Sequence, residues 1–343
     1  MKALKIILLM LVLIAVAFAI IAYSGPQNIE IKVEKTIDAP NDVINKYASQ
    51  FAFFDQWNPW IYSERSAESI TTEVSGTDGE ESAQLKWRNK KSHEKGIQTL
   101  RSLKKNERID FDLLIEGEPS AQYSLTLHAE NDSTTTVNLN YQSEFNGLIP
   151  RFFATLQGGQ QKKELSTGFE KGLNNLKLLS ENYKNLQFSG YNIKRKKYSG
   201  GLFLAKRDTI PTSAITPFLG QNFYRAMYQI QDQNVKTVGM PTGIYYDFLG
   251  NDKTDIAAGI GIQGDIHEAP GFEIIGIPAA QALELMYFGE YTEIDKAHNA
   301  MDEYLEYFNL IKTDPVLEEY ITDPSLEPDT SKWKTKITYF LKN

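Results

Sequence analysis

The hydrophobic and polar positions of the chain divide it into an apolar N-terminal run and two long regions of mixed pattern. The apolar run covers residues 6–23, follows Lys2 and Lys5, and ends in a Ser-Gly-Pro turn at residues 24–26. Eighteen residues of helix rise about 27 Å, which is enough to cross the hydrocarbon core of a bilayer. Residues 1–25 are therefore predicted to be a transmembrane anchor.

A cleaved secretory signal is the alternative interpretation of this run. Ala17-Phe18-Ala19 offers an A-x-A cleavage site. The run is longer than an ordinary signal core, and bulky Ile20 and Ile21 follow the site, which favours the anchor. Lysines before the run place the N-terminus inside and both folded regions outside the cytoplasm, in a single-pass membrane protein. After cleavage the same regions would be secreted.

The first folded region, residues 27–184, has a strand-rich pattern that ends in a helix. Residues 29–37 alternate between apolar and polar, as a half-buried strand does, and Pro40 precedes a short helical segment. Several β-like runs separated by polar turns follow, and they predict an antiparallel meander. After Pro150 an apolar face recurs at the spacing of a helix, at Leu165, Phe169, Leu173, Leu176 and Leu179.

The opening of this region resembles a known family. The segment VEKTIDAPNDVINKYASQFAFFDQWNPW, residues 33–60, is similar to the start of START-like, polyketide-cyclase-type (SRPBCC) domains. The resemblance implies a helix-grip fold, in which an antiparallel sheet surrounds a long C-terminal helix and leaves a cavity for an apolar ligand. Trp57 and Trp60 are then candidates for the mouth of that cavity, and core packing is the alternative for both.

The second folded region, residues 188–343, repeats one plan. Residues 200–248 and 271–323 each read as a strand and a helix, followed by a Pro-containing turn and a Tyr-bearing segment. A repeat near 75 residues is too long for a solenoid. It fits a duplicated strand-helix-strand-strand unit of α+β class, whose two halves close a pocket between them. Ligand sites are common at such interfaces.

Two short motifs in this region carry a second resemblance. The Y-x-G-x-Y element at residues 287–291 and the P-x-x-E-x-Y element at residues 315–320 are similar to the gyrase-inhibitor-like (GyrI-like) effector-binding domain, and the closing strand WKTKITYFLK matches as well. The resemblance implies a pocket with aromatic walls and acidic residues that holds lipophilic, often cationic, compounds. Carried over by position, Glu318 and Tyr320 are its main candidates.

The alternation of side chains along a strand is a second argument, independent of the resemblance, for considering Glu318 as a pocket residue. Glu318 and Glu319 are adjacent, so in a strand they face opposite sides and only one can point into a pocket. Lys336 stands where the resembled family has an acid, and it could neutralise Glu318, so a cationic ligand is not the default. The predicted ligand-binding residues are Glu318, Tyr320, Tyr287, Tyr291, Tyr245, Tyr246 and Trp333, with Trp57 and Trp60 in the first region.

Charge and composition narrow the function further. The net charge of −8 argues against nucleic-acid binding, and the absence of cysteine excludes disulfides and thiol catalysis. His267 and His298 lack the spacing of a metal site, and both are expected on the surface. No cofactor motif and no protein partner is indicated. The sequence predicts membrane-anchored binding or sequestration of small lipophilic molecules; the alternative is a hydrolase or cyclase with Glu318 as base.

Overall fold

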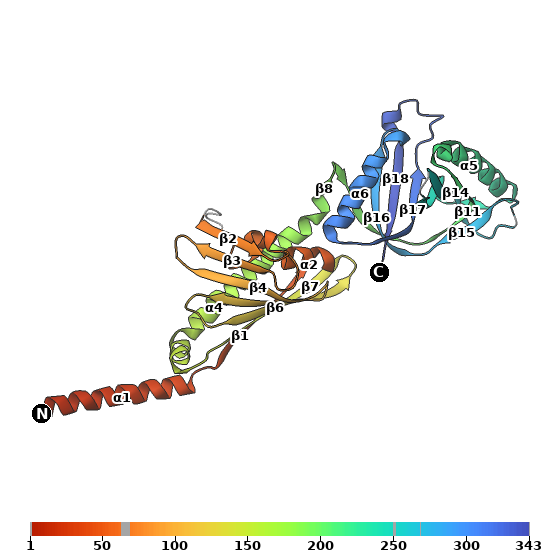
Figure 1. Ribbon diagram of the computed structural model, residues 1–343. Coiled ribbons are helices and arrows are strands. Elements are labelled where there is room, and N and C mark those ends of the chain that lie inside the picture. The colour runs from red at the N-terminus through yellow and green to blue at the C-terminus, as the bar shows by residue number, and fades with distance from the viewer. Residues whose placement is uncertain (1, 63–68, 250–251, 268, 343) are drawn as a thin grey trace. The chain divides into compact units, whose positions relative to one another are not determined.

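The computed structural model describes residues 2–62, 69–249, 252–267 and 269–342. The protein is of mixed α+β class, with antiparallel sheets and one apolar helix near the N-terminus (Figure 1). Its contacts divide it into two compact units, Met1–Tyr183 (unit 1) and Lys184–Asn343 (unit 2).

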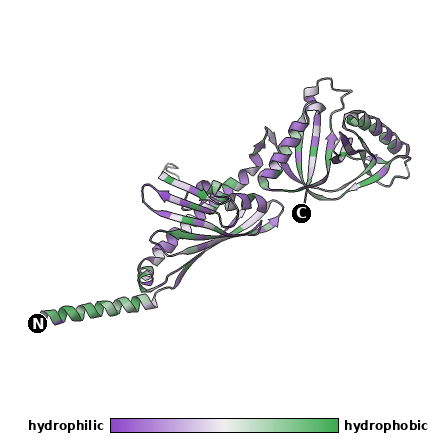
Figure 2. Cartoon of the chain, viewed as in Figure 1, coloured by the Kyte–Doolittle hydropathy of each residue, from purple (hydrophilic) through white to green (hydrophobic). Residues whose placement is uncertain are grey.

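The N-terminal apolar run forms one uninterrupted helix, α1 (Lys2–Ser24). Figure 2 shows that α1 is hydrophobic along almost its entire length. The segment Leu4–Ser24 is long and apolar enough to cross a membrane, a criterion that a signal sequence near an N-terminus also meets. No basic or acidic side chain interrupts it after Lys5.

Unit 1 contains one antiparallel sheet and a long helix. Its strands are β1 (Asn28–Ile37), β2 (Ile70–Ser75), β3 (Gln84–Asn89), β4 (Lys95–Lys104), β5 (Arg108–Ile115), β6 (Ala121–Asn131) and β7 (Thr134–Glu144). Its helices after α1 are α2 (Asn41–Ser49), η1 (Phe51–Phe53), α3 (Phe54–Trp57) and α4 (Leu148–Glu181), followed by η3 (Asn182–Asn185). The seven strands pair in the order β1-β7-β6-β5-β4-β3-β2.

The core of unit 1 lies between this sheet and its helices. Phe169, Leu173 and Leu176 of α4 are buried, at the spacing that the sequence pattern predicts for one helix face. Gly172, on the same helix, allows close packing on the α3 segment, because a Cβ there would lie 2.9 Å from the carbonyl oxygen of Trp57. Helix α4 therefore closes the unit through aromatic and aliphatic contacts.

Unit 2 contains a nine-stranded sheet, a two-stranded sheet and two main helices. Its strands are β8 (Gln187–Phe188), β9 (Tyr191–Asn192), β10 (Lys194–Tyr198), β11 (Gly201–Pro211), β12 (Lys236–Thr237), β13 (Thr242–Leu249), β14 (Lys253–Gln263), β15 (Glu273–Ile277), β16 (Ala280–Phe288), β17 (Lys312–Tyr320) and β18 (Lys334–Leu341). Its helices are η4 (Thr212–Ala214), α5 (Ile215–Asp232), η5 (Tyr291–Glu293), α6 (Asp295–Phe308) and η6 (Thr330–Lys332).

The order strand, helix, strand, strand occurs twice in unit 2, as β11-α5-β13-β14 and as β16-α6-β17-β18. The main sheet has the order β10-β16-β18-β17-β13-β14-β11-β15, and its ninth strand, β12, pairs with β14 off this path. Its two halves meet where β13 pairs with β17, and Gly243 there lies opposite Glu318. The strand that follows the helix in each half, β13 or β17, thus belongs to this central ladder, which brings both helices toward one site.

The two faces of this sheet have separate apolar cores. On one face Leu204 and Ile260 pack against Ala226 and Ile230 of α5. On the other face Leu317 lies in a cluster of side chains supplied by six strands, namely Phe203, Ala205, Ile244, Ala257, Ile277, Ala282 and Phe340. Because neighbouring strand residues face opposite sides, a residue next to Leu317 must point toward the helices.

Candidate ligand-binding site

A cavity of about 820 Å³ lies in unit 2 on the helix-covered face of the sheet. Helix α5, the start of α6, η5 and strands β13 and β17 surround it. Its lining residues are Thr212, Ile215, Thr216, Leu219, Gly220, Phe223, Met240, Pro241, Tyr245, Tyr291, Thr292, Ile294, Asp295, His298, Glu318, Tyr320, Ile321, Thr322, Asp323 and Pro324. The volume suits a drug-sized organic molecule.

Glu318 is the buried carboxylate of this cavity. Its neighbour Leu317 enters the core on the opposite face of the sheet, so the pleat of β17 turns Glu318 toward the helices. Only 4% of Glu318 is exposed to solvent. A buried carboxylate is costly unless donors surround it, so its partners decide whether the arrangement is stable.

Three side chains from three different elements supply those donors. Tyr320 Oη donates to Glu318 Oε2 at 2.7 Å, and Tyr245 Oη, from β13, lies 3.1 Å from the same oxygen. The two tyrosine hydroxyls are also 2.9 Å apart, which allows Tyr245 to donate to Tyr320 instead. His298 Nε2, from α6, lies 2.9 Å from Glu318 Oε1. The carboxylate is thus held on both oxygens.

Burial changes the acidity of the two tyrosines. It raises the pKa of Tyr245 and of Tyr320 well above the ordinary value of 10.0, and the charge of nearby Glu318 raises both further. Burial likewise raises the pKa of Tyr291, which is on the cavity wall. These hydroxyls therefore stay protonated and remain hydrogen-bond donors at neutral pH.

His298 belongs to the site, whereas the sequence analysis expected it on the surface. Its Nδ1 lies 3.0 Å from Tyr339 Oη, so the ring bridges Tyr339 and Glu318. A carboxylate can only accept, so Nε2 carries the hydrogen, and a neutral ring then accepts from Tyr339 at Nδ1. The helical spacing could have revealed this: His298 is in phase with Ile294 and Met301, the latter fully buried.

Lys336 does not neutralise Glu318, as the sequence analysis considered. It forms an ion pair with Glu319. The register of β17 with β18 places Lys336 directly across from Glu319 and Ile337 across from Glu318. Since cross-strand partners share a face, the lysine lies on the opposite side of the sheet from the cavity. Among the described residues, His298 is the basic side chain in contact with Glu318.

The remaining candidates of unit 2 lie at different distances from the cavity. Tyr291 lines it and packs edge-on against Tyr320, with ring centroids 5.3 Å apart. Trp333 stands behind Tyr291, 4.8 Å between centroids, and its Nε1 donates to the carbonyl of Glu327 at 2.8 Å. Trp333 is therefore placed to support the wall that Tyr291 forms.

Tyr287 and Tyr246 are not among the residues that line the cavity. Tyr287 is buried on β16, where its hydroxyl donates to the carbonyl of Glu290 at 2.8 Å. Tyr246 packs against the core on the opposite face, with the guanidinium of Arg207 3.5 Å from its ring centroid. Tyr245 and Tyr246 are adjacent in β13, so only one of them can face the helices.

Trp57 is buried in unit 1, whereas Trp60 is half-buried. Trp57 is 1% exposed, its Nε1 donates to the carbonyl of Tyr47 at 3.0 Å, and its ring packs on Phe54. The Trp60 ring lies 5.4 Å from that of Phe169 of α4. Both tryptophans thus contact aromatic rings of the core, and Trp60 keeps part of its surface exposed.

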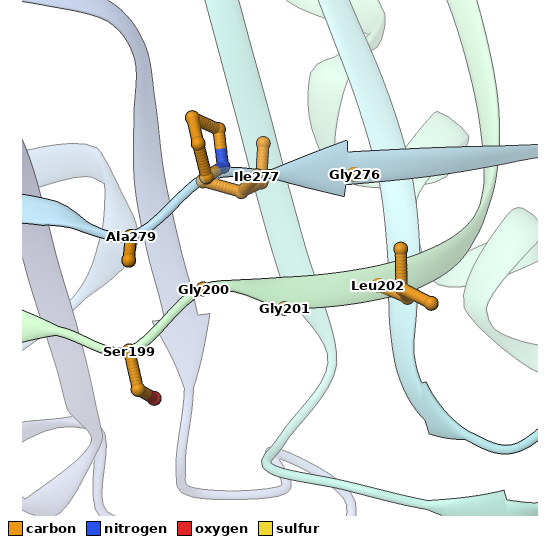
Figure 3. Close-up of a pocket in the computed structure, with 8 residues that line it drawn as sticks. Ser199, Gly200, Gly201, Leu202, Gly276, Ile277 and Ala279 are labelled. Carbon is orange, nitrogen blue, oxygen red and sulfur yellow. The ribbon is translucent and has the colours of Figure 1, made fainter.

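A second hollow, of about 530 Å³, lies where the chain passes from β10 to β11 and from β15 to β16 (Figure 3). Gly200, with a φ of +87°, and Gly201 form one side, and residues 276–279 form the other. Its lining contains no titratable side chain, so it offers little chemistry. In the described part of the chain, no group of three or more His, Asp or Glu is placed to hold a metal ion.

No protein-family model and no curated protein matches the sequence. Similar solved structures include the C-terminal domain of EcmrR, 18% identical, with 45% of this chain and 98% of that domain covered and a TM-score of 0.39. A protein of unknown function from Staphylococcus aureus is 16% identical over 48% of this chain and 99% of its own, with a TM-score of 0.38. CalU16 from Micromonospora echinospora is 17% identical over 44% of this chain and 75% of its own, at 0.31. Scores this low do not establish a common function, so function is inferred below from the site itself.

Proposed function

We propose that unit 2 binds a small lipophilic cation in the cavity beside Glu318. The observation that carries this proposal is a buried, ionisable carboxylate that opens onto a cavity with largely apolar and aromatic walls. A lipophilic body would cover Ile215, Leu219 and Phe223 of α5, while a cationic group would compensate the charge of Glu318. Tyr245 and Tyr320 face the same space and offer aromatic rings to a cation.

The distribution of charge around the cavity supports a cation over an anion. The lining holds three carboxylates, those of Glu318, Asp295 and Asp323. Its basic side chain is that of His298, and it contains no lysine or arginine. The sequence suggested that Lys336 could neutralise Glu318. Lys336 instead forms an ion pair with Glu319 on the other face of the sheet. Lys336 therefore does not oppose a cationic ligand, although it still stands where the resembled family has an acid.

Three predictions from the sequence accompany this proposal. Anchoring through α1 would hold the cavity near a bilayer, where lipophilic compounds concentrate. The START-like character of unit 1 stays a prediction, and the proposal places the ligand in unit 2 because the cavity beside Glu318 lies there. Hydrolase or cyclase activity with Glu318 as base also stays a prediction.

The test compares two ions of the same shape and opposite charge. Isothermal titration of the purified chain with tetraphenylphosphonium and with tetraphenylborate should show binding of the cation alone. Glu318→Gln keeps the size of the side chain and removes its charge. We expect it to weaken cation binding by about 2 kcal/mol, or roughly thirty-fold in Kd.

Glu319→Gln is the matched control, because it makes the same change one residue away on the opposite face of β17. It should leave the Kd for the cation unchanged. Equal affinity for both ions, or equal weakening by both substitutions, would contradict the proposal.

A further inference from the structure

The start of α4 exposes an unusual set of large apolar side chains. Leu148, Ile149, Phe153 and Leu156 are each between 46% and 64% exposed. Exposed apolar residues scattered singly are ordinary, but a contiguous group commonly marks a surface that contacts another molecule or a membrane. These four belong to the first three turns of one helix.

The four side chains lie on one side of α4. At about 100° per residue, Leu148, Ile149, Phe153 and Leu156 fall within an arc of about 140°. Farther along the helix the same side becomes polar and stays exposed, at Gln160, Lys163, Thr167 and Glu170. One helix side thus changes from apolar to polar within a single turn, which is the pattern of a segment that leaves an apolar medium.

The apolar end of α4 also packs directly on α1. The rings of Phe18 and Phe152 lie 4.6 Å apart, and Thr155 Oγ1 lies 3.4 Å from the carbonyl oxygen of Ile21. Phe18 precedes the last residue of α1, Ser24, by six positions, or about 9 Å along the helix axis. The depth to which interfacial helices insert is about 5–10 Å. If α1 crosses a bilayer, the contact between Phe18 and Phe152 holds the start of α4 about 5–10 Å below the membrane surface.

We propose that residues 148–156 of α4 form a second membrane-contacting element, which lies in the headgroup region of the bilayer beside α1. The partner is the lipid itself. Lys162 and Lys163 are exposed one to two turns farther along, where cationic groups would meet lipid phosphates. The inference rests on the proposed anchoring through α1, and it fixes the orientation of unit 1 on the surface, since one helix alone would leave that unit free to rotate.

The natural absence of cysteine makes a direct test practical. Single cysteines are introduced into the full-length chain at Phe153, at Thr167 and at Ile14, labelled with an environment-sensitive fluorophore, and reconstituted in phosphatidylcholine–phosphatidylglycerol vesicles. Thr167 is the matched control, because it lies on the same side of α4, about 21 Å farther along. Ile14, in the middle of α1, reports on the anchor separately. Leu156→Cys repeats the measurement if Phe153→Cys folds poorly.

The label at residue 153 should lose its emission when nitroxide lipids are present and resist iodide, whereas the label at residue 167 should show the reverse. If nitroxide lipids quench the label at residue 14 while iodide quenches the label at residue 153, the inference is overturned and the anchoring through α1 still holds. Iodide quenching of the labels at residues 14 and 153 would contradict both the anchoring through α1 and the inference about α4. Protection of residue 153 from both quenchers would assign the surface to a second copy of the chain, and that outcome also overturns the proposal.

Discussion

At the scale of single residues, the site is built around one buried carboxylate that accepts hydrogen bonds from neighbouring side chains. Glu318 receives hydrogen bonds on both oxygens, from Tyr320 on one and from His298 on the other. These bonds offset part of the cost of burying the charge, but they bring no fixed positive charge with them. These donors explain how the carboxylate can be buried without a ligand, and the cation proposed above would add a compensating charge.

The tyrosines of the site should make stability depend on alkaline pH. The unfolded chain releases the protons of Tyr245 and Tyr320 near the ordinary pKa of 10.0, whereas the folded protein holds them to a higher pH. Their contribution to stability is complete below pH 10 and is lost as pH rises from there toward the folded pKa values.

Thermal unfolding between about pH 8 and pH 11 tests this sign. The melting temperature of the protein should change little up to about pH 9 and then fall toward about pH 11. The double variant Tyr245→Phe/Tyr320→Phe should lose less because it lacks these two hydroxyls, and the loss that remains should come from other buried tyrosines. Tyr224→Phe, on the exposed side of α5, should reproduce the full loss. An unchanged slope in the double variant would show that these two hydroxyls do not titrate as described.

At the scale of secondary structure, β13 must leave room for two aromatic side chains. A Cβ added at Gly243 would lie 2.8 Å from the ring of Tyr245 and 3.1 Å from Tyr320 Oη. Both neighbours are buried and hydrogen-bonded, so neither moves freely. Gly243→Ala should therefore destabilise the protein by about 1–3 kcal/mol and weaken ligand binding, as overpacking does.

Denaturant unfolding and ligand titration together check the expectation for Gly243. Gly276→Ala is the control in the same sheet, because its Cβ would meet only the end of the Leu202 side chain, at 3.4 Å. That variant should change neither quantity appreciably. A Gly243→Ala protein with normal stability and affinity would mean that the tyrosines adjust without cost.

At the scale of the whole molecule, the cavity belongs to one unit. All its lining residues lie between Thr212 and Pro324, inside unit 2. Residues 184–343 expressed alone should therefore fold and bind tetraphenylphosphonium with the Kd of the full chain, as calorimetry can measure. A Kd weaker by ten-fold or more, which corresponds to about 1.4 kcal/mol, would show that unit 1 contributes to the site.

Local pattern alone determined much of the secondary structure. The apolar run predicted α1, alternation predicted β1, and the recurring strand, helix and strand pattern predicted the order of elements in both halves of unit 2. The sequence also required Glu318 and Glu319 to face opposite sides, because neighbouring residues in a strand must do so. Each of these conclusions depends only on residues that are close together in the chain.

Tertiary structure decided the rest, because strand register and helix docking join residues that are distant in the chain. The register of β17 with β18 places Lys336 opposite Glu319, with which it forms an ion pair, and places Ile337 opposite Glu318. The pairing of β13 with β17 brought Tyr245 to Glu318, and the docking of α6 added His298, whose helical phase hinted at burial but not at a partner. The sequence alone assigned no role to the apolar start of α4, and only its exposure and its packing beside α1 support the lipid contact proposed above.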